Sequence, residues 1–326
     1  MDMEIKTDRE VEVLVIGAGM AGLLAARALR AAGRKAVVID KGRGLGGRMA
    51  TRRIGGATFD HGAQFITARD ARFAALLEEA GVAGAASEWC RGFSGKGDGH
   101  ARWRGVPGMT GLARYLAQGL EIVQEKQVEA LRVSEGGWTV EMTGGESWAA
   151  KAVILTAPVP QSLVLLAKGG VVLPEVWKGR LEAIEYERCL AVMAVLDGPS
   201  NLPEPGGFAP AAGPIAWMAD NQKKGVSVEA AVTIHATPAF SFEHWDKDRD
   251  EAARVLLEAA APWLGVGVKT VQVHGWKFSK PVQVDAEACA VVHRAPMLVL
   301  AGDSFCGSRV EGAALSGWAA AEAVLA

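Results

Sequence analysis

The stretch from residue 11 to residue 40 decides the fold, and it runs VEVLVIGAGMAGLLAARALRAAGRKAVVID. Residues 11–17 are a short apolar run, rich in β-branched side chains and closed by glycine, which predicts a buried strand. Alanine and leucine then recur at helical spacing until Gly33, a residue type that commonly ends helices. Residues 35–40 repeat the strand pattern. A strand, a helix and a second strand within this length predict a parallel sheet.

Three glycines in this stretch, Gly17, Gly19 and Gly22, form the pattern G-x-G-x-x-G between the first strand and the helix. Such glycines allow a tight turn and let a pyrophosphate approach the backbone, while the helix N-terminus supplies partial positive charge. Asp40 ends the second strand 23 residues after Gly17, where a carboxylate can accept both hydroxyls of a ribose. We therefore predict a dinucleotide site. Because an acid at this position repels a 2′-phosphate, NADP is not the expected ligand.

The rest of the chain predicts a first domain interrupted by a second. Residues 121–158 show short alternating runs broken by glycine pairs, typical of a small antiparallel excursion. Residues 185–278 hold further strand-like runs and one clear helix, which indicates a separate antiparallel lobe. A buried strand at 295–303 and a closing helix complete the first domain. The predicted boundaries are 1–80, 105–160 and 285–326 for the dinucleotide-binding domain, and 81–104 and 161–284 for the substrate lobe.

Composition excludes several classes of protein. The 326 residues carry 35 basic and 37 acidic side chains, so the chain lacks the electrostatic footprint of a nucleic-acid binder. The four cysteines lie far apart, which disfavours a zinc site or a disulfide framework, and no metal is expected. The first twelve residues are acidic rather than signal-like, and the apolar run 13–26 is too short and glycine-rich for a bilayer. We expect a cytoplasmic protein with no membrane partner.

The choice between NAD and FAD depends on Gly46-Gly47-Arg48, six positions after Asp40. Here the sequence resembles the flavoprotein oxidases related to amine oxidases, in which this extension wraps the FAD pyrophosphate. The resemblance implies that Arg48 supplies charge-assisted hydrogen bonds. A second family landmark is the segment FDHGAQ at 59–64. Without the resemblance, the basic residues here are equally consistent with an ordinary loop: Arg43, Arg48, Arg52 and Arg53.

The C-terminal segment supports the same family. Gly302-Asp303 closes a strand, and the sequence RVEGA at 309–313 opens the last helix. The resemblance implies that Asp303 holds the ribityl or pyrophosphate region of FAD, and that the helix N-terminus points at the flavin N1/C2=O edge. A helix dipole stabilises negative charge there by about 0.3–1 kcal/mol. Taken alone, Asp303 is also consistent with a helix cap or a turn.

Five segments together resemble the renalase-type flavoproteins, especially the bacterial ones, over nearly the whole chain: 60–73, 102–117, 152–161, 273–281 and 302–321. Residues 162–270 match only loosely. The resemblance implies a Rossmann-type FAD-binding domain with an antiparallel-sheet substrate lobe, and non-covalent FAD whose N5 takes hydride from the substrate. It also implies that O2 reoxidises the flavin to give hydrogen peroxide. The implied substrates are the 2- and 6-dihydro isomers of NAD(P)H, which become NAD(P)+ in metabolite repair.

The residues expected at FAD combine the glycine pattern, the ribose acid and the family positions. They are Gly17, Gly19, Met20, Ala21, Gly22, Asp40, Lys41, Arg43, Gly46, Gly47, Arg48, Met49, Gln64, Val128, Ala157, Pro158, Gly302, Asp303, Arg309, Val310, Glu311 and Ala313.

The expected substrate-lining residues are Gln64, His61, His274 and Trp276. In the run VQVHGWKF, a period of two places His274 and Trp276 on one strand face, which would form an apolar wall with polar groups in it. A dihydropyridine loses hydride without prior deprotonation, so no dedicated catalytic base is expected. An equally weighted interpretation is a strand packed between lobes with a hydrogen-bonded core histidine. Gly275 stands where bacterial relatives usually carry arginine, which puts any phosphate or carboxamide contact there in doubt.

Three alternatives remain open. One is a flavin amine oxidase acting on a small amine, although neither its flavin-proximal lysine nor its flanking aromatic pair can be placed in this sequence. Another is an NAD(P)H-dependent flavin hydroxylase, whose close relatives share the glycine pattern but lack GGR followed by RVEGA. The third is a flavoprotein that binds FAD structurally or as a redox sensor, without turnover.

Overall fold

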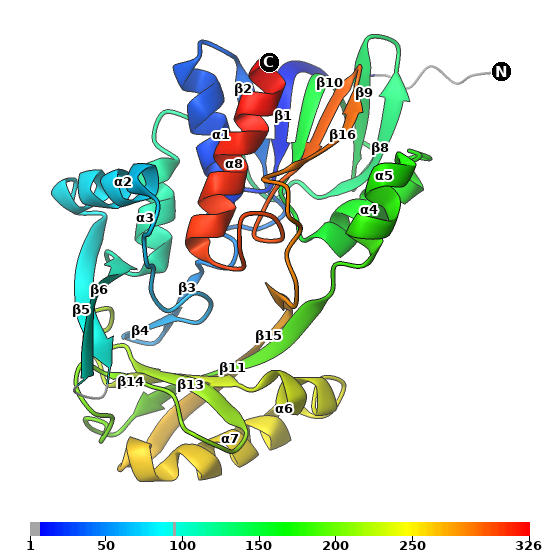
Figure 1. Ribbon diagram of the computed structural model, residues 1–326. Coiled ribbons are helices and arrows are strands. Elements are labelled where there is room, and N and C mark those ends of the chain that lie inside the picture. Colours follow the sequence, from blue (N-terminus) through cyan, green and yellow to red (C-terminus); the bar gives the residue numbers. More distant parts are fainter. Residues whose placement is uncertain (1–6, 94–95) are drawn as a thin grey trace. The chain divides into compact units, whose positions relative to one another are not determined.

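The computed structural model describes residues 7–93 and 96–326, and the chain divides into two compact units (Figure 1). The first unit comprises Met1–Gly47, Ala113–Glu185 and Pro281–Ala326. The second comprises Arg48–Leu112 and Tyr186–Lys280. The first unit is therefore built from three stretches of the chain and the second from two. The boundaries differ from the predicted ones, because 48–80 and 105–112 pack in the second unit and 161–185 and 281–284 in the first.

An eight-stranded sheet forms the centre of the first unit, with the order β16-β17-β10-β1-β2-β7 and with β8 and β9 attached beside β10. Pairing is parallel from β17 through β7, whereas β16, β9 and β8 pair antiparallel. The strands are β1 (Arg9–Ile16), β2 (Ala36–Ile39), β7 (Glu121–Val123), β8 (Val128–Ser134), β9 (Gly137–Met142), β10 (Ser147–Leu155), β16 (Ala290–Arg294) and β17 (Met297–Leu300). This arrangement confirms the predicted parallel sheet and its antiparallel excursion.

Two long helices cover one face of this sheet. Helix α1 (Met20–Ala31) follows β1 directly, and α8 (Val310–Leu325) packs beside it, as Figure 1 shows. Their close approach depends on Gly317, since a Cβ there would lie 2.2 Å from the carbonyl oxygen of Ala21. Helices α4 (Val159–Lys168) and α5 (Glu175–Glu182) complete the unit, and α3 (Met109–Leu116) begins in the second unit and ends in the first.

A five-stranded antiparallel sheet forms the second unit, with the order β12-β13-β14-β11-β15. Its strands are β11 (Tyr186–Leu196), β12 (Gly207–Phe208), β13 (Ile215–Asp220), β14 (Ala231–Ala236) and β15 (Val268–Pro281). Two hairpins and three helices accompany it: β3 (Thr51–Ile54) with β4 (Ala57–Asp60), β5 (Ala86–Phe93) with β6 (Lys96–Gly105), α2 (Ala71–Val82), α6 (Pro238–Glu243) and α7 (Arg249–Leu264). The predicted antiparallel lobe and its single clear helix, α7, are therefore present.

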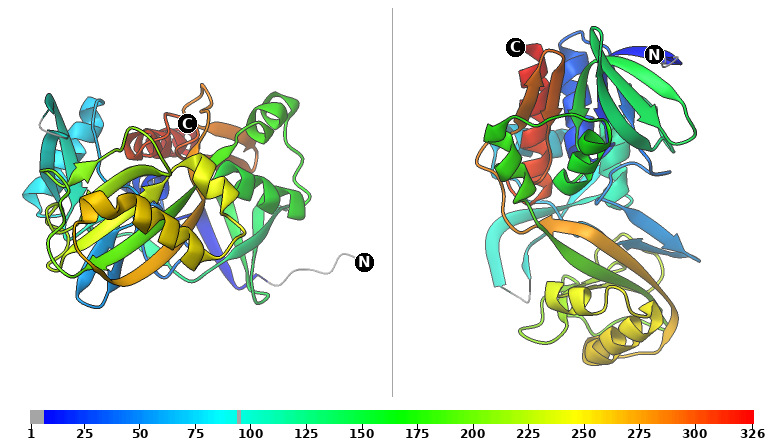
Figure 2. Two further views of the ribbon diagram at one scale, coloured as in Figure 1. Left: turned by 90° about the horizontal axis from the view of Figure 1, so that it is seen from below. Right: turned by 90° about the vertical axis from the view of Figure 1, so that its right-hand side faces the viewer.

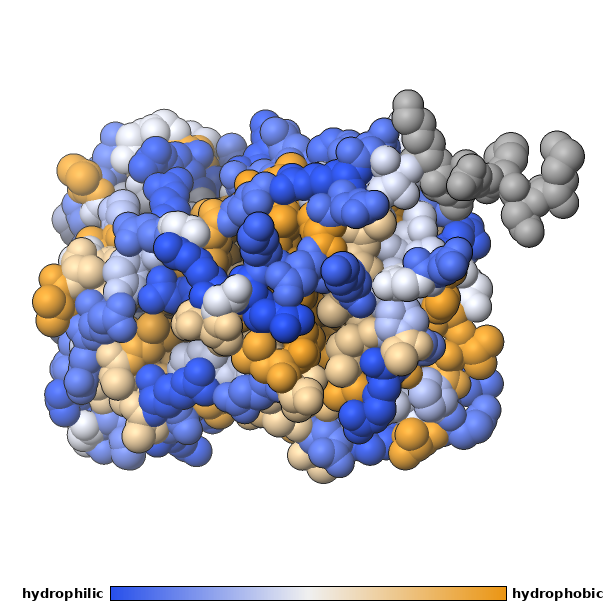
Figure 3. Space-filling model, turned by 90° about the horizontal axis from the view of Figure 1, so that it is seen from above, coloured by the Kyte–Doolittle hydropathy of each residue, from blue (hydrophilic) through white to orange (hydrophobic). Residues whose placement is uncertain are grey.

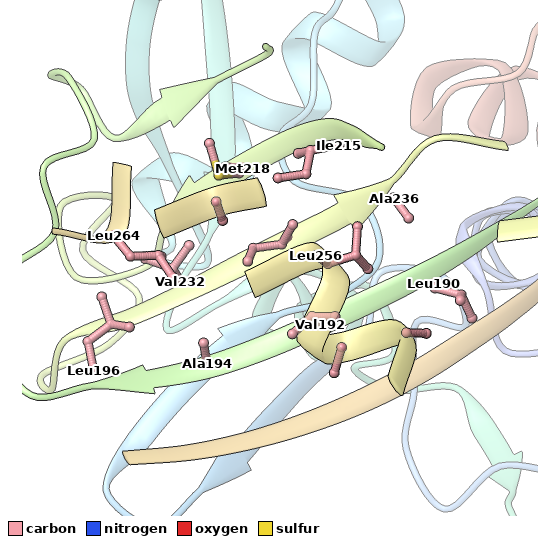
Figure 4. Packing of buried hydrophobic residues seen from close by; sticks show 14 of the residues in the cluster. Leu190, Val192, Ala194, Leu196, Ile215, Met218, Val232, Ala236, Leu256 and Leu264 are labelled. Carbon is pink, nitrogen blue, oxygen red and sulfur yellow. The ribbon is translucent and has the colours of Figure 1, made fainter. Parts of the chain in front are cut away.

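The two faces of the five-stranded sheet bury different partners. Figure 2 shows α6 and α7 lying across one face, where Val192, Ile234 and Leu256 belong to a large apolar cluster (Figure 4). The β3–β4 hairpin packs on the other face, where Phe59 contacts a cluster that includes Met193. Side chains alternate along each strand, so neighbouring residues of β11 serve the two different cores. The second face, next to the hairpin, carries the candidate site described below.

No helix among the described residues is long and apolar enough to cross a membrane. The face of the molecule in Figure 3 carries mostly hydrophilic residues with hydrophobic ones scattered among them. All four cysteines are free thiols, and only Cys189 is fully buried.

Candidate functional site

The glycine turn after β1 has the conformation that the sequence pattern requires. Gly17 has a φ of +113°, and a Cβ there would lie 2.4 Å from Thr156 Oγ1. A Cβ at Gly22 would lie 1.9 Å from the carbonyl oxygen of Gly17. By contrast, a Cβ at Gly19 would meet no atom within 4 Å, so this position faces open space. The turn is closed on its inner side by the protein and open where a ligand would approach.

The N-terminus of α1 is suited to an anion. Gly19 is its N-cap residue and makes no side-chain hydrogen bond to the helix, and the first turn contains no acidic residue. The first amide groups of a helix lack intrahelical partners and carry partial positive charge, so an uncapped N-terminus next to open space favours a phosphate. Met20 and Ala21, which begin the helix, are buried and hold it against the core. The turn therefore fits the pyrophosphate of a dinucleotide.

Asp40 lies directly after β2, at the carboxyl edge of the parallel sheet. Its Oδ2 accepts a hydrogen bond from the backbone N–H of Ala18 at 2.7 Å, and its Oδ1 accepts one from Gly42 N–H at 2.6 Å. The carboxylate thus joins the glycine turn to the loop after β2, and each oxygen keeps a further lone pair for a ribose hydroxyl. The contact of Asp40 with a ribose stays a prediction.

The Gly46-Gly47-Arg48 segment is divided between the two units. The backbone N–H of Gly46 donates to Ala18 O at 2.9 Å, and Gly47 packs near the Cα of Gly19, so both glycines lie beside the turn. Arg48 begins the second unit, where its Nη1 donates to Phe278 O at 3.3 Å and to Ser279 O at 3.4 Å. The structure thus places this guanidinium against β15, and a contact with FAD remains a prediction.

A second uncapped helix N-terminus lies in the first unit. Arg309 is the N-cap of α8 and gives it no side-chain hydrogen bond, and Glu311 in its first turn is 8% exposed. Strand β17, the last before this helix, ends at Leu300, two residues before Gly302. The N–H of Gly302 donates to Ser316 Oγ at 2.9 Å, and the following Asp303 is buried. The helix-terminus geometry expected of the C-terminal motif is therefore present.

The other residues expected at FAD differ in environment. Lys41 and Arg43 are exposed, and the carbonyl oxygen of Arg43 accepts a hydrogen bond from Gln124 Nε2 at 2.8 Å. Val128 is buried in β8, and Pro158 is the N-cap residue of α4 directly after Ala157. Val310 and Ala313 lie in the first turn of α8, and Met49 is buried in the second unit.

The candidate substrate residues lie in the second unit, where Asp60 anchors the segment that begins with His61. Asp60 Oδ1 accepts from Thr51 Oγ1 at 2.6 Å and from the N–H of Met109 at 2.8 Å, and Oδ2 accepts from Lys224 Nζ at 2.8 Å. Both side chains of the Asp60–Lys224 pair are 0% exposed. Lys224 carries no mark in the sequence, because a lysine in the polar run NQKKG gives no local sign of burial.

Backbone contacts hold the rest of this segment. Gln64 Nε2 donates to Asp60 O at 2.7 Å and to Gly62 O at 3.0 Å, so this amide fixes the loop that contains it. The carbonyl oxygen of His61 accepts from Trp276 Nε1 at 2.8 Å and lies 3.1 Å from His235 Nε2. Since a carbonyl can only accept, Nε2 of His235 carries the proton. The structure therefore adds His235 to the expected residues.

Three rings gather on the hairpin side of the five-stranded sheet, and we call them the aromatic cluster: His61, His274 and Trp276. His61 is stacked on Trp276 with ring centroids 5.2 Å apart and planes 19° apart. His274 meets both rings edge-on, at 4.8 Å from His61 and 4.3 Å from Trp276. His61 is buried, whereas His274 and Trp276 are partly exposed and can contact a ligand.

The imidazoles of this region are uncharged at neutral pH. Burial, together with the neighbouring His274 and Arg52, lowers the pKa of His61 to about 3, and burial lowers the pKa of His235 to about 4. The pKa of His274 is lowered by burial and then by Arg52 and Arg249. Such weakly basic rings can pack and hydrogen-bond, but they are poor acceptors of a substrate proton near pH 7.

Comparisons with known proteins agree with this geometry. A family model described as an NAD(P)-binding Rossmann-like domain matches residues 15–80, and one described as flavin containing amine oxidoreductase matches residues 84–325. Renalase from Mus musculus is 26% identical over 325 residues, covering 92% of this chain and 94% of that protein. Putrescine oxidase from Kocuria rosea is 40% identical over 77 residues, which cover 24% of this chain and only 16% of that enzyme.

Solved structures of low sequence identity share the fold. A putative protoporphyrinogen oxidase from Exiguobacterium sp. 255-15 superposes with a TM-score of 0.76 at 16% identity, covering 98% of this chain and 99% of the other. A variant of putrescine oxidase superposes with a TM-score of 0.74 at 17% identity, covering 97% and 99%.

Proposed function

Because this chain belongs to the family of flavin containing amine oxidoreductases and is an FAD-dependent oxidoreductase, we propose that it is a renalase-type oxidase. Its proposed substrates are the 2- and 6-dihydro isomers of NAD(P)H, its proposed acceptor is O2, and its products are NAD(P)+ and hydrogen peroxide. The observation that carries this proposal is the similarity to renalase, which extends over 92% of the chain, whereas the similarity to putrescine oxidase covers only 24%.

Bound FAD would supply the redox chemistry, accepting a hydride at its N5 position and passing two electrons to oxygen. The residues of the first unit would hold the cofactor. Asp40 would accept the ribose hydroxyls, and the uncapped N-termini of α1 and α8 would face negative charge on the ligand. Arg48 and the segment 59–64 belong to the second unit. We propose FAD contacts for them on the family resemblance alone.

The aromatic cluster would orient the substrate ring. A dihydronicotinamide is flat and uncharged, and the partly exposed rings of His274 and Trp276 offer it a surface for stacking. His61 supports this surface from behind, because its ring stacks on Trp276 and its carbonyl accepts the indole N–H. Hydride loss from such a ring needs no prior proton removal, which agrees with imidazoles that are poor bases.

An amine oxidase remains the competing function. A protonated amine favours an adjacent carboxylate, yet Asp60, the acid next to the aromatic cluster in sequence, is buried and paired with Lys224. Both histidines of the cluster experience positive rather than negative neighbouring charge. These features favour an uncharged ring over a cation.

The test is an anaerobic titration of the purified flavoprotein. Chemically reduced NAD, a mixture of dihydro isomers, is added while the flavin absorbance is followed, with authentic NADH and simple amines as separate controls. We expect bleaching by the mixture and not by the controls. Bleaching by NADH or by an amine instead moves the function to a competing class, and a protein without a flavin band contradicts the cofactor assignment.

A further inference from the structure

We propose that Arg52 makes this site specific for an anionic substrate, with its guanidinium binding the phosphate of a dihydronicotinamide nucleotide. The inference rests on the proposed function and narrows it, because it separates nucleotides from the phosphate-free riboside and from amines. No sequence motif singles out this arginine, which stands in the basic run TRR at 51–53.

The pairing of the β3–β4 hairpin shows where Arg52 points. Arg52 lies opposite Phe59, and Ile54 lies opposite Ala57. Residues paired across antiparallel strands project to the same face, and residues two apart on one strand share that face. Ile54, Ala57 and Phe59 are buried against the five-stranded sheet, in the cluster that contains Met193. Arg52 therefore projects from the end of the hairpin toward the same sheet.

The aromatic cluster lies on that face of the sheet. Val271 and Val273 of β15 pack into the core beneath α7, so the alternating residues His274 and Trp276 point to the opposite face, where the hairpin packs. Consistent with this placement, Arg52 is close enough for its charge to lower the pKa of both His61 and His274. The guanidinium thus lies beside a partly exposed aromatic surface.

Arg52 is available to a ligand. Among residues 7–93 and 96–326 it forms no ion pair or hydrogen bond with another side chain, and it is only partly buried. The carboxylate of Asp60 cannot neutralise it, because Asp60 pairs with Thr51 on the opposite hairpin face and is saturated by Lys224 and two further donors. An unneutralised guanidinium beside neutral rings attracts anions and repels ammonium groups.

This charge pattern fits the chemistry of the proposed substrate. A dihydronicotinamide ring is uncharged, so its phosphate is the group by which the protein can distinguish a nucleotide from the corresponding riboside. Arginine binds phosphate through two parallel N–H···O bonds, which fix orientation as well as add affinity. A phosphate held by Arg52 would therefore align the attached ring with the aromatic cluster.

The experiment compares two ligands that differ only in the phosphate, nicotinamide mononucleotide and nicotinamide riboside. Each is titrated into the FAD-loaded protein by calorimetry and by the perturbation of flavin absorbance. We expect the wild-type protein to bind the mononucleotide at least about tenfold more tightly than the riboside. Arg52→Gln is expected to reduce this ratio to less than about twofold, and Arg52→Lys to leave it in between.

Arg53→Gln is the matched control. Arg53 pairs with Thr58, so it projects from the other hairpin face, and it is exposed. This variant should keep the wild-type ratio. A wild-type protein that binds both ligands equally overturns the inference, as does an Arg52→Gln variant that keeps the tenfold ratio. If Arg52→Gln fails to fold, competition by inorganic phosphate in the wild-type protein is the test instead. Phosphate is expected to compete with the mononucleotide and to leave the binding of the riboside unchanged, and any other result overturns the inference.

Failure of the proposed function has a different signature. The 2- and 6-dihydro forms of both ligands are added anaerobically at saturating concentration, and flavin bleaching is recorded. If neither bleaches the flavin, the proposed function is wrong. If both bleach it and both bind equally, only the role of Arg52 is wrong. An amine that binds more tightly to Arg52→Gln than to the wild-type protein, and bleaches the flavin, contradicts both.

Discussion

Lys224 Nζ lies 2.8 Å from Asp60 Oδ2, and neither side chain has any exposed surface. The two residues come from distant parts of the chain and meet next to His61, whose backbone and ring belong to the candidate substrate site. Desolvation of two charges is costly, and the pair persists because Asp60 also accepts from Thr51 and from the N–H of Met109. The segment that begins with His61 is therefore anchored by a buried network of hydrogen bonds and one ion pair.

Breaking this pair should destabilise the protein strongly. Lys224→Met leaves a buried carboxylate without its counter-ion, and we expect a loss of about 3–5 kcal/mol in the free energy of unfolding. The double variant Asp60→Asn, Lys224→Met should lose less free energy of unfolding than the two single variants lose together. Urea unfolding of the FAD-saturated protein measures the loss for each variant. The matched control is Arg132→Met, which breaks an exposed pair with Glu141 and should cost less than about 1 kcal/mol. Additive single changes contradict the prediction.

Asp40→Asn should weaken FAD binding. In the wild-type protein the N–H groups of Ala18 and Gly42 each donate to one carboxylate oxygen of Asp40. The NH2 group of an asparagine would face one of these donors, so one charge-assisted hydrogen bond is lost. We expect the dissociation constant of FAD to rise roughly 10- to 100-fold, measured by titrating FAD into apoprotein. Glu12→Gln is the control, because Glu12 accepts from Lys35 N–H at the opposite end of the same two strands. Wild-type affinity in Asp40→Asn argues against the ribose assignment.

Stability should fall as the pH drops from about 6.5 toward 4. Burial lowers the pKa of His61 to about 3 and that of His235 to about 4, while both histidines titrate near 6.5 in the unfolded chain. In this window the unfolded state binds more protons, so each histidine contributes a slope of about 1.4 kcal/mol per pH unit, and above it the contribution is constant. His235→Gln should reduce the slope by roughly 1 kcal/mol per pH unit between pH 6 and 5, measured by urea unfolding at pH 7, 6 and 5. Exposed His100→Gln is the control, and an unchanged slope in His235→Gln disproves the assignment.

Trp276→Phe should separate substrate binding from cofactor binding. The change keeps an aromatic ring but removes the indole N–H that donates to His61 O at 2.8 Å. We expect normal FAD content, a loss of about 0.5–1.5 kcal/mol in stability, and slower flavin reduction in anaerobic stopped-flow experiments. Trp245→Phe, on the α7 side of the sheet, is the control and should leave reduction unchanged. An unfolded Trp276→Phe, or one that is reduced normally, favours a packing role for this strand.

Much of the first unit was predictable because its signals are local. The strand, turn and helix of residues 11–40 contain the glycines, the helix start and Asp40 within one supersecondary unit, and the structure joins Asp40 to the glycine turn through the N–H of Ala18. The closing strand and helix near the C-terminus were predictable for the same reason. The domain boundaries were less accurate, since nothing in residues 48–80 shows which of two sheets they will pack against.

The sequence by itself determined the dinucleotide turn, the parallel sheet and the alternation that puts His274 and Trp276 on one face, because each depends on neighbours within a few residues. Only the tertiary structure decided which residues meet that face. Lys224 reaches Asp60 across 164 positions, and His235 reaches His61 across 174. Arg52 projects toward the five-stranded sheet because Phe59, its partner across the hairpin, is buried there. Such contacts depend on how distant segments pack, and the periodicity of a single strand carries no information about its partner.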